Sequence, residues 1–384
     1  MRRSKPLLVT GCYRSGTTFV EKILNMHPAL TVASQPFPVL YLMAMERFHH
    51  SLGIVRRYPL DHCFLEDAYS ADELVSFLER DVYDEDAVTD LVVRLGEYSH
   101  GLWTPQILDL LEGLRPGTFY DLYHQLNERI ARLFPNENCA WLGGKEVLTE
   151  ELAGPLGRIG TRTVFVVRDP RAMITSLNFR QRDNLTGNLR PVLYSIRAWR
   201  KSVAFGIEAQ KSGSALMIRY EDLVTDHRAT LARVTDFLNV GPYADSAFAE
   251  GIVDQHGATW AGNSSFVDQR GISEASLANY REHLPSSVQT FIEALSEPEM
   301  RLLGYGVESD AATLRDAIEG YRDPFENVHE KFSPEYSSDP SRIQAERHRL
   351  DALGSGLGPA ERRRWFITDA AYDALVSRQI FFER

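Results

Sequence analysis

The stretch Pro6-Leu7-Leu8-Val9-Thr10-Gly11-Cys12-Tyr13-Arg14-Ser15-Gly16-Thr17-Thr18 decides the fold expected for this chain. Its first five residues form an apolar run that predicts a short buried strand, and a helical pattern continues from the threonines to about Asn25. The turn between them contains two glycines. Such a turn directs successive backbone N–H groups inward, and the following helix adds the positive end of its dipole. The stretch therefore predicts an anion-binding loop suited to phosphate.

The glycine spacing of this loop is similar to that of a nucleotide-binding P-loop, with one important difference. Thr17 stands where the lysine of a kinase or NTPase belongs, so contact with a β/γ-phosphate pair is hard to arrange. Arg14 can instead bring positive charge to a single phosphate and to the group that this phosphate carries. A purely structural strand-to-helix turn with incidental glycines is the alternative.

A second anion site is predicted farther along the chain. Residues 163–167 form a continuous apolar run, which is typical of a strand buried on both faces of a parallel sheet. Asp169-Pro170 has the pattern of an N-cap and first helical residue, and the helix should continue to about residue 179. Arg168 ends the strand and Ser176 lies about two turns into the helix, so an arginine and a hydroxyl could together bind an anion. An ion-paired strand end is the structural alternative.

The remaining pattern alternates strands with helices, with a strand expected at 215–220 and helices at 227–238 and 285–303. This order predicts an α/β, P-loop-like three-layer fold with a central parallel sheet. We expect a domain of residues 1–306 with a helical, acceptor-binding insert at about 40–140. Residues 307–384 should form a C-terminal extension, a linker followed by short helices near 341–352 and 359–377. It would pack on the body or on a second subunit, or form a substrate lid.

Composition excludes several classes of protein. The chain has 384 residues, 43% hydrophobic and 25% charged, which is typical of a globular protein. It contains no apolar run of about 18 residues, and its basic N-terminus lacks the apolar core of a signal peptide. Three cysteines without C-x-x-C spacing indicate neither a disulfide framework nor a zinc site. No basic stripe with interleaved aromatics indicates nucleic-acid binding. We therefore expect a cytoplasmic protein.

The negative charge is concentrated in one segment. The formal net charge is −11, and residues 61–100 hold 12 acidic residues but only two basic ones, Arg80 and Arg94. This pattern is typical of the solvated face of surface helices. A selector that repels anionic acceptors is the functional alternative.

The two anion-binding motifs together resemble the sulfotransferases that use 3′-phosphoadenosine-5′-phosphosulfate (PAPS). Residues 12–18 match the 5′-phosphosulfate loop of this family, and Arg168 with Ser176, eight residues apart, matches its 3′-phosphate site. The resemblance covers roughly residues 6–306. Three later matches fall in the same order: Gly144-Lys145, whose lysine would approach the sulfate; Tyr220-Glu221-Asp222-Leu223, near the adenosine; and Asn263-Ser264-Ser265-Phe266 before Arg270, in a loop that closes over the nucleotide.

This resemblance implies an enzyme that moves a sulfuryl group from PAPS to a hydroxyl or amine of a small-molecule or glycan acceptor. The second product would be adenosine 3′,5′-bisphosphate (PAP). Lys145 would stabilise the transferring group, and no metal is required because a sulfuryl group carries less negative charge than a phosphoryl group. The donor-binding residues implied are Arg14, Ser15, Gly16, Thr17, Thr18, Arg168, Ser176, Tyr220, Ser264, Ser265, Phe266 and Arg270.

The general base is not decided by the resemblance. Many relatives carry a glutamate in a Glu-Pro pair where this chain has Gln35, and glutamine cannot accept a proton. The histidine that follows the lysine by two in cytosolic relatives is replaced by Val147. Glu146, beside Lys145, and the insert histidines His100 and His124 are the candidates that remain. An acceptor nucleophilic enough to need little base assistance is a further possibility.

Two other functions are compatible with the motifs. A P-loop kinase or NTPase would use Asp169 as a Walker-B aspartate, and a degenerate nucleotide-binding module would have lost catalysis. The extension could also support a homo-oligomer. The acceptor is not identified, because the aromatic residues of the insert could line its site or form core: Phe64, Tyr69, Phe77, Tyr83, Trp103, Phe119, Tyr120 and Tyr123.

Overall fold

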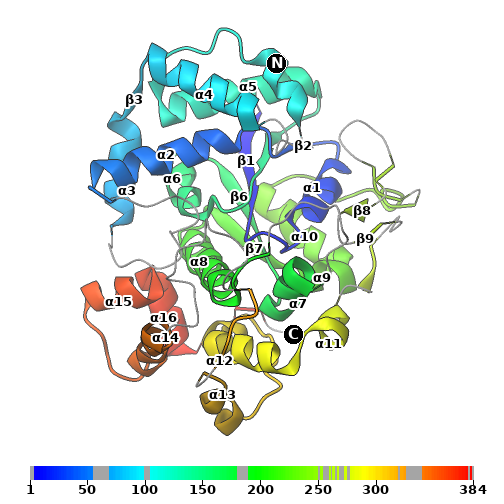
Figure 1. The fold of residues 1–384 in the computed structure, drawn as a ribbon. Coiled ribbons are helices and arrows are strands. Elements are labelled where there is room, and N and C mark those ends of the chain that lie inside the picture. Colours follow the sequence, from blue (N-terminus) through cyan, green and yellow to red (C-terminus); the bar gives the residue numbers. More distant parts are fainter. Residues whose placement is uncertain are drawn as a thin grey trace.

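The computed structural model describes residues 4–54, 69–98, 104–179, 189–249, 277–318, 321–325, 340–378 and 381–382, with short pieces between 251 and 274. At the centre of the molecule, five parallel strands form one sheet in the order β2-β5-β1-β6-β7 (Figure 1). The predicted α/β fold with a central parallel sheet is confirmed. The strands are β1 (Lys5–Thr10), β2 (Leu30–Ser34), β5 (Trp141–Lys145), β6 (Arg162–Val167) and β7 (Ala215–Arg219).

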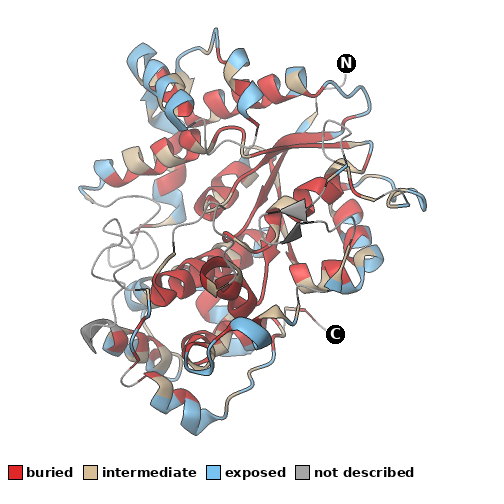
Figure 2. Ribbon diagram, turned by 45° about the vertical axis from the view of Figure 1, so that its right-hand side comes forward, coloured by how far each residue is buried: buried red, intermediate tan, exposed pale blue. Residues whose placement is uncertain are grey.

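Helices cover both faces of this sheet, because successive side chains of a strand point to opposite faces. On one face Val9 and Val164 share a core with α1 and α10, and on the other Phe165 and Met217 share a core with α8 and α12. Figure 2 shows the strands and α8 as buried elements inside more exposed helices. The helices of the body are α1 (Thr17–Asn25), α6 (Ala153–Arg158), α7 (Pro170–Ile174), α8 (Val192–Lys211), α9 (Tyr220–Thr225), α10 (His227–Leu238), α11 (Asn279–His283) and α12 (Ser286–Leu302).

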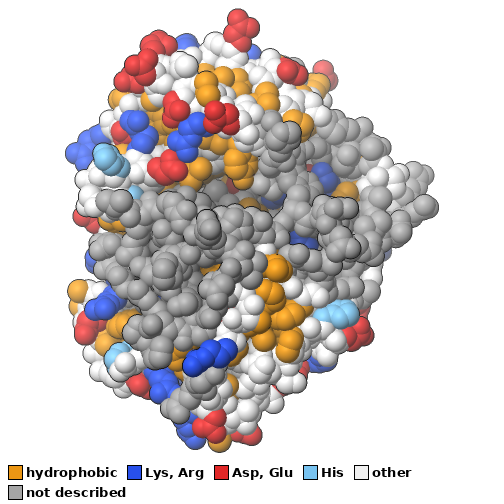
Figure 3. Space-filling model, in the orientation of Figure 1, with side chains coloured by type: hydrophobic (Ala, Val, Ile, Leu, Met, Phe, Trp, Pro, Cys, Tyr) orange, Lys and Arg blue, Asp and Glu red, His pale blue; other side chains and the backbone are white. Residues whose placement is uncertain are grey.

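The predicted helical insert forms a separate layer over one end of the sheet (Figure 1). Its side chains share a core with Leu8 and Ala33 of the sheet. The acidic residues described between 69 and 98 are exposed except the partly buried Asp81, and Figure 3 shows acidic and basic side chains mixed on this part of the surface. The elements are α2 (Pro38–Ser51), α3 (Ala71–Arg80), β3 (Val82–Tyr83), α4 (Glu85–Glu97), β4 (Gly117–Thr118) and α5 (Phe119–Leu133).

The C-terminal extension packs on the body of its own chain. Its apolar residues belong to the same core as α8 and α12. Glu346, fully buried, pairs with Arg197 at 2.7 Å and with Arg200 at 2.6 Å, both on α8. Because a buried carboxylate needs such partners, this ion-pair cluster ties the extension to the body. The extension contains α13 (Ala311–Ile318), α14 (Pro340–Ala352), α15 (Pro359–Phe366) and α16 (Asp369–Ser377).

The helix after Asp169 reaches Phe179 as predicted, although its second half, Thr175–Phe179, is a π-helix. Two other predicted boundaries are wrong. The last predicted helix is divided into α15 and α16 around Ile367, whose φ is 69°. Tyr220 begins α9 rather than ending β7. Strands β2 and β5 and the long helix α8 were not predicted. Among the described residues, no helix is both long and apolar enough to cross a membrane.

Candidate active site

The candidate site residues lie at one edge of the sheet, where all five parallel strands end. The pairing register places Val9 and Ser34 opposite Lys145, and Val167 opposite Arg219. Loops at the carboxyl ends of parallel strands form the usual binding crevice of such sheets. The first residues after the strands are Gly11, Gln35, Glu146, Arg168 and Tyr220.

The loop after β1 is held in shape by its own serine. The Ser15 hydroxyl donates to the carbonyl oxygen of Cys12 at 2.5 Å, and the Ser15 amide donates to the same oxygen at 3.2 Å. Arg14 has a φ of 63°, and Gly16 has a φ of 97° at the N-cap of α1. This left-handed backbone turns the chain into a nine-residue helix whose first residue is Thr17, with Thr18 second. The amides of this turn and the helix dipole can bind an anion.

Tyr220 explains why residue 16 must be glycine. A Cβ at Gly16 would overlap the Tyr220 ring, so any other residue would displace it. The same ring contacts a cation, because the Arg168 guanidinium lies 4.5 Å from its centroid. Tyr220 therefore joins the two predicted anion sites.

The two predicted motifs are in direct contact. Arg14 donates from Nε and Nη2 to the Ser176 hydroxyl at 3.1 and 3.0 Å, across 162 residues of sequence. Arg168 Nη1 donates to the Arg14 carbonyl oxygen at 3.2 Å, and Trp199 Nε1 donates to the Arg168 carbonyl oxygen at 2.8 Å. The π-helix carries Ser176 at the point where it meets Arg14. Two motifs distant in sequence thus form one cationic site.

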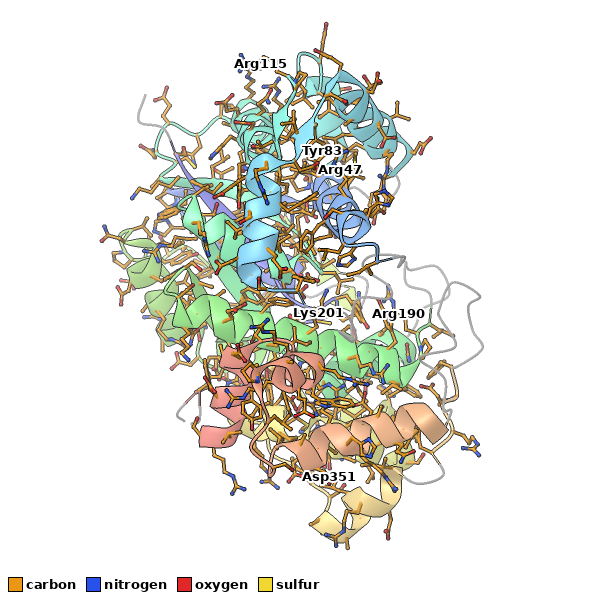
Figure 4. All side chains as sticks on the ribbon, turned by 90° about the vertical axis from the view of Figure 1, so that its left-hand side faces the viewer. Arg47, Tyr83, Arg115, Arg190, Lys201 and Asp351 are labelled. Atoms are coloured by element: carbon orange, nitrogen blue, oxygen red, sulfur yellow. The ribbon has the colours of Figure 1, made fainter. Side chains whose placement is uncertain are left out.

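Arg190 is a third arginine at this site, and sequence analysis did not identify it. Its guanidinium lies 4.3 Å from the centroid of the Tyr13 ring, and it forms no ion pair among the described residues. Burial, together with the charges of Arg168 and Arg190, lowers the pKa of Arg14 to about 10. The mutual repulsion of these guanidinium groups favours a bound anion. In Figure 4, Arg190 lies at the N-terminal end of α8. The only signal in the sequence is an arginine before Pro191, ahead of a helix that was not predicted.

Lys145, Glu146 and Gln35 meet where β2 and β5 end. Lys145 Nζ donates to Gln35 Oε1 at 3.1 Å, and the Gln35 amide donates to the Lys145 carbonyl oxygen at 2.8 Å. Glu146 Oε1 accepts a hydrogen bond from the Phe37 amide at 3.1 Å, whereas Glu146 Oε2 has no hydrogen-bond partner among the described residues. Burial lowers the pKa of Lys145 and raises the pKa of Glu146. The site therefore contains a carboxyl group suited to exchanging a proton near neutral pH.

The charge of Glu146 affects the pKa values of two tyrosines of the insert, Tyr41 and Tyr98, which the sequence did not indicate. Burial and the charge of Glu146 both raise the pKa of Tyr41, whose hydroxyl has no hydrogen-bond partner among the described residues. Burial and Glu146 also raise the pKa of Tyr98, and Arg190 opposes this shift. Tyr98 is 45% exposed, so it lies at the surface of the insert. Of the aromatics predicted as core or acceptor site, Tyr69, Tyr83, Phe119 and Tyr123 are buried core, and Phe77 and Tyr120 are partly buried against it.

Two acidic residues near Arg168 have structural partners. Asp169 caps α7 through the Arg171 amide and pairs with the Arg171 guanidinium at 2.6 Å. Glu221 Oε1 accepts a hydrogen bond from the Asp169 amide at 3.0 Å, and Glu221 Oε2 accepts one from the Tyr305 hydroxyl at 3.0 Å. These contacts hold the turn that presents Arg168.

Several predicted residues are not brought into this site by the structure. His124 is on α5, in ring contact with Tyr123. Only the backbone of Phe266 is described, in the hairpin of β8 (Gly262–Asn263) and β9 (Phe266–Val267). Ser264, Ser265, Arg270 and His100 lie outside the described residues, as do the aromatics Phe64 and Trp103.

Comparison with known proteins points to one family. The model of the sulfotransferase family matches residues 6–245, well over half of the chain. No curated protein matches the chain significantly. Among solved structures, the sulfotransferase domain of the curacin biosynthetic pathway is 18% identical, over 80% of this chain and 100% of that one, with a TM-score of 0.45. The sulfotransferase domain of the Synechococcus PCC 7002 olefin synthase is 18% identical, over 74% and 90%, with a TM-score of 0.44. A sulfotransferase from Mycobacterium avium is 14% identical, over 80% and 79%, with a TM-score of 0.37.

Proposed function

The chain belongs to the sulfotransferase family, and we propose that it transfers a sulfuryl group from PAPS to a hydroxyl or amine of a small-molecule or glycan acceptor. PAP is the second product. The observation that carries this proposal is the contact of Arg14 with Ser176 at 3.0 Å, beside Arg168. A donor with phosphate groups at two positions of one nucleoside needs two adjacent oxyanion sites, and this contact joins two such sites at one sheet edge.

The chain's own residues suit the binding of this donor. Arg14 and residues 15–18 would hold the 5′-phosphosulfate through the loop amides and the start of α1. Arg168 and Ser176 would hold the 3′-phosphate. Burial and the charges of Arg168 and Arg190 lower the pKa of Arg14, and the negative charge of the nucleotide would relieve the repulsion among these arginines. When bound, the donor supplies the activated sulfuryl group, and the protein supplies position and fixed positive charge.

Lys145 would stabilise the charge that develops on the transferring group, because its ammonium is held at the strand end by Gln35. Glu146 would accept the proton of the acceptor. Parallel pairing of β2 and β5 puts residue 146 next to residue 35, so a carboxyl group remains at this place although residue 35 is glutamine. The Oε2 atom of Glu146 would accept that proton, because it has no hydrogen-bond partner among the described residues. Gln35 would orient the lysine.

A kinase or NTPase is the less favoured reading. The loop lacks the lysine of those enzymes, and Asp169 is engaged by Arg171 and by the α7 amide, not placed to bind a metal ion. A nucleotide-binding module without catalysis would need the same donor site. Only a measurement of sulfuryl transfer distinguishes such a module from the proposed enzyme.

Thermal denaturation with two nucleotides tests the donor site. PAP should raise the melting temperature and ATP with Mg²⁺ should not, because a ligand stabilises only the fold that binds it. Incubation with ³⁵S-labelled PAPS and a panel of hydroxyl and amine acceptors then measures transfer. Stabilisation by ATP and Mg²⁺ alone would refute the proposal, and stabilisation by PAP without transfer to any acceptor would favour the binding module.

A further inference from the structure

A short piece of the C-terminal extension, residues 321–325, contacts the elements that carry the cationic site, although it lies outside the part of the chain that the family model matches. We infer that Asp323 is a positioning residue for donor binding, which acts by holding Arg190. This inference rests on the proposed function, because it assumes that the cationic site binds the nucleotide.

The side chain of Arg190 contacts the donor loop, residues 11–18. Its guanidinium lies over the ring of Tyr13, within the loop itself, and its charge contributes to the lowered pKa of Arg14. The Tyr13 hydroxyl in turn donates to the Ser195 hydroxyl at 3.0 Å, on the first turn of α8. A displacement of the start of α8 would therefore move both Arg190 and the ring beneath it.

Asn178 holds the backbone of Arg190, and Asp323 holds the helix start that follows it, at Val192 and Leu193. Asn178 Nδ2 donates to the Arg190 carbonyl oxygen at 2.8 Å, and the Arg190 amide donates to Asn178 Oδ1 at 3.3 Å. Asp323 Oδ2 accepts from the first two amides of α8, those of Val192 at 2.6 Å and Leu193 at 3.4 Å. Pro191, the N-cap residue, provides no side-chain cap.

Asp323 satisfies amides that water does not reach easily. Val192 is fully buried and Leu193 is 2% exposed, while Asp323 itself is 6% exposed. The initial amides of a helix have no partner within the helix, and a carboxylate at that end is also stabilised by the helix dipole. The first turn of α8 thus depends on a side chain from the extension.

The same segment also contacts the helix that carries Ser176. Asp323 Oδ1 accepts from the Phe325 amide at 2.9 Å, and the Phe325 ring packs against Phe179 with centroids 5.2 Å apart. Phe179 ends the π-helix that contains Ser176. Residues 321–325 therefore connect the element that carries Ser176 to the element that begins after Arg190.

The test is a double-mutant cycle read by calorimetric titration of the full chain with PAP. Arg190→Ala and Asp323→Ala should each weaken binding, and the double variant should be no weaker than Arg190→Ala within error, because Asp323 acts through Arg190. We expect Asp323→Ala to cost about three- to tenfold in Kd, the range typical of coupled positions. Asp323→Asn should restore most of the affinity, since an amide oxygen can still accept from the α8 amides.

Asp310→Ala is the matched control. Asp310 lies in the same extension and caps α13 by accepting from the Ala312 and Thr313 amides, both at 2.9 Å, but it is exposed. Its replacement should leave the Kd for PAP unchanged.

The outcomes separate this inference from the proposed function. Wild-type protein that does not bind PAP overturns the proposed function and this inference with it. Wild-type binding combined with unchanged affinity of Asp323→Ala, or with fully additive losses in the double variant, overturns the inference alone. If Asp323→Ala does not fold, the cycle is run with Asp323→Ser, whose shorter side chain keeps an acceptor oxygen but reaches the α8 amides less well, and additivity with Arg190→Ala again overturns the inference.

Discussion

Replacing Arg168 with alanine tests the second anion site. The Arg168 side chain is held from two sides: Nη1 donates to the Arg14 carbonyl oxygen at 3.2 Å, and the guanidinium lies 4.5 Å from the Tyr220 ring centroid. The residue is only 5% exposed, so its charge acts where water screens poorly. An arginine held in this way is already oriented for bidentate contact with a phosphate.

The expected loss combines two opposing effects. A hydrogen bond to a charged group contributes about 1.5–3 kcal/mol, and a bidentate contact contains two of them. Removal of Arg168 also relieves the repulsion that helps to lower the pKa of Arg14, which offsets part of this loss. We therefore expect PAP binding to weaken by about 2–3 kcal/mol, or about 30- to 150-fold in Kd.

Isothermal titration calorimetry with PAP measures this change. Arg168→Lys keeps the charge but not the planar pair of donors, so its Kd should lie between those of the wild type and Arg168→Ala. Arg80→Ala is the control, because Arg80 is exposed on α3 and its one side-chain hydrogen bond to a described residue is to the Ser76 carbonyl oxygen. An Arg168→Ala Kd within about twofold of the wild-type value, in a protein with an unchanged melting temperature, would exclude Arg168 from the donor site.

Three further predictions follow from particular contacts. Glu146→Gln should lower kcat by about 10²- to 10⁴-fold with PAP affinity retained. Burial raises the pKa of Glu146 and lowers the pKa of Lys145, so the base form of Glu146 appears and the Lys145 ammonium is lost as pH rises. The wild-type rate should therefore rise to a maximum and then fall. A rising limb that persists in Glu146→Gln would exclude this base. Gly16→Ala should lower the free energy of unfolding by about 1–3 kcal/mol, because the added Cβ would overlap Tyr220 at a φ of 97°. Urea denaturation measures this loss, and an unchanged midpoint would contradict the prediction. Glu346→Ala should lower the free energy of unfolding by about 3–5 kcal/mol, because it leaves two buried arginines of α8 without their carboxylate. The same urea denaturation measures this loss. A loss below about 1 kcal/mol would show that this ion-pair cluster does not hold the extension.

The local sequence pattern was sufficient to predict the strands and helices that carry the two candidate donor-binding motifs. β1 and β6 each contain an uninterrupted apolar run, and the helix after β1 ends at Asn25 as predicted. β5 was missed because Trp141-Leu142-Gly143-Gly144-Lys145 has two glycines, which are unfavourable in strands. A Cβ at Gly143 would overlap the Leu7 carbonyl, so glycine there is required by the neighbouring strand and not by β5 itself.

The helix α8 was missed for a related reason. Sixteen of its 20 residues are buried, so no polar face gives it an amphipathic period. Its charged residues are not on a solvent face: Arg197 and Arg200 pair with Glu346, and Lys201 pairs with Glu151 at 3.1 Å. These partners are distant in sequence, so no local window contains them.

Residue types and their spacing were enough to predict two candidate anion-binding motifs and to find the strand–helix units that present them, because steric and hydrogen-bonding rules act over a few residues. Which groups share the site was settled only when the chain folded. Arg14 meets Ser176, and Arg190 joins them, because the strand order brings distant turns to the same edge. Charge interactions depend on distance in space, and that distance is set by the packing of the whole sheet and its helices.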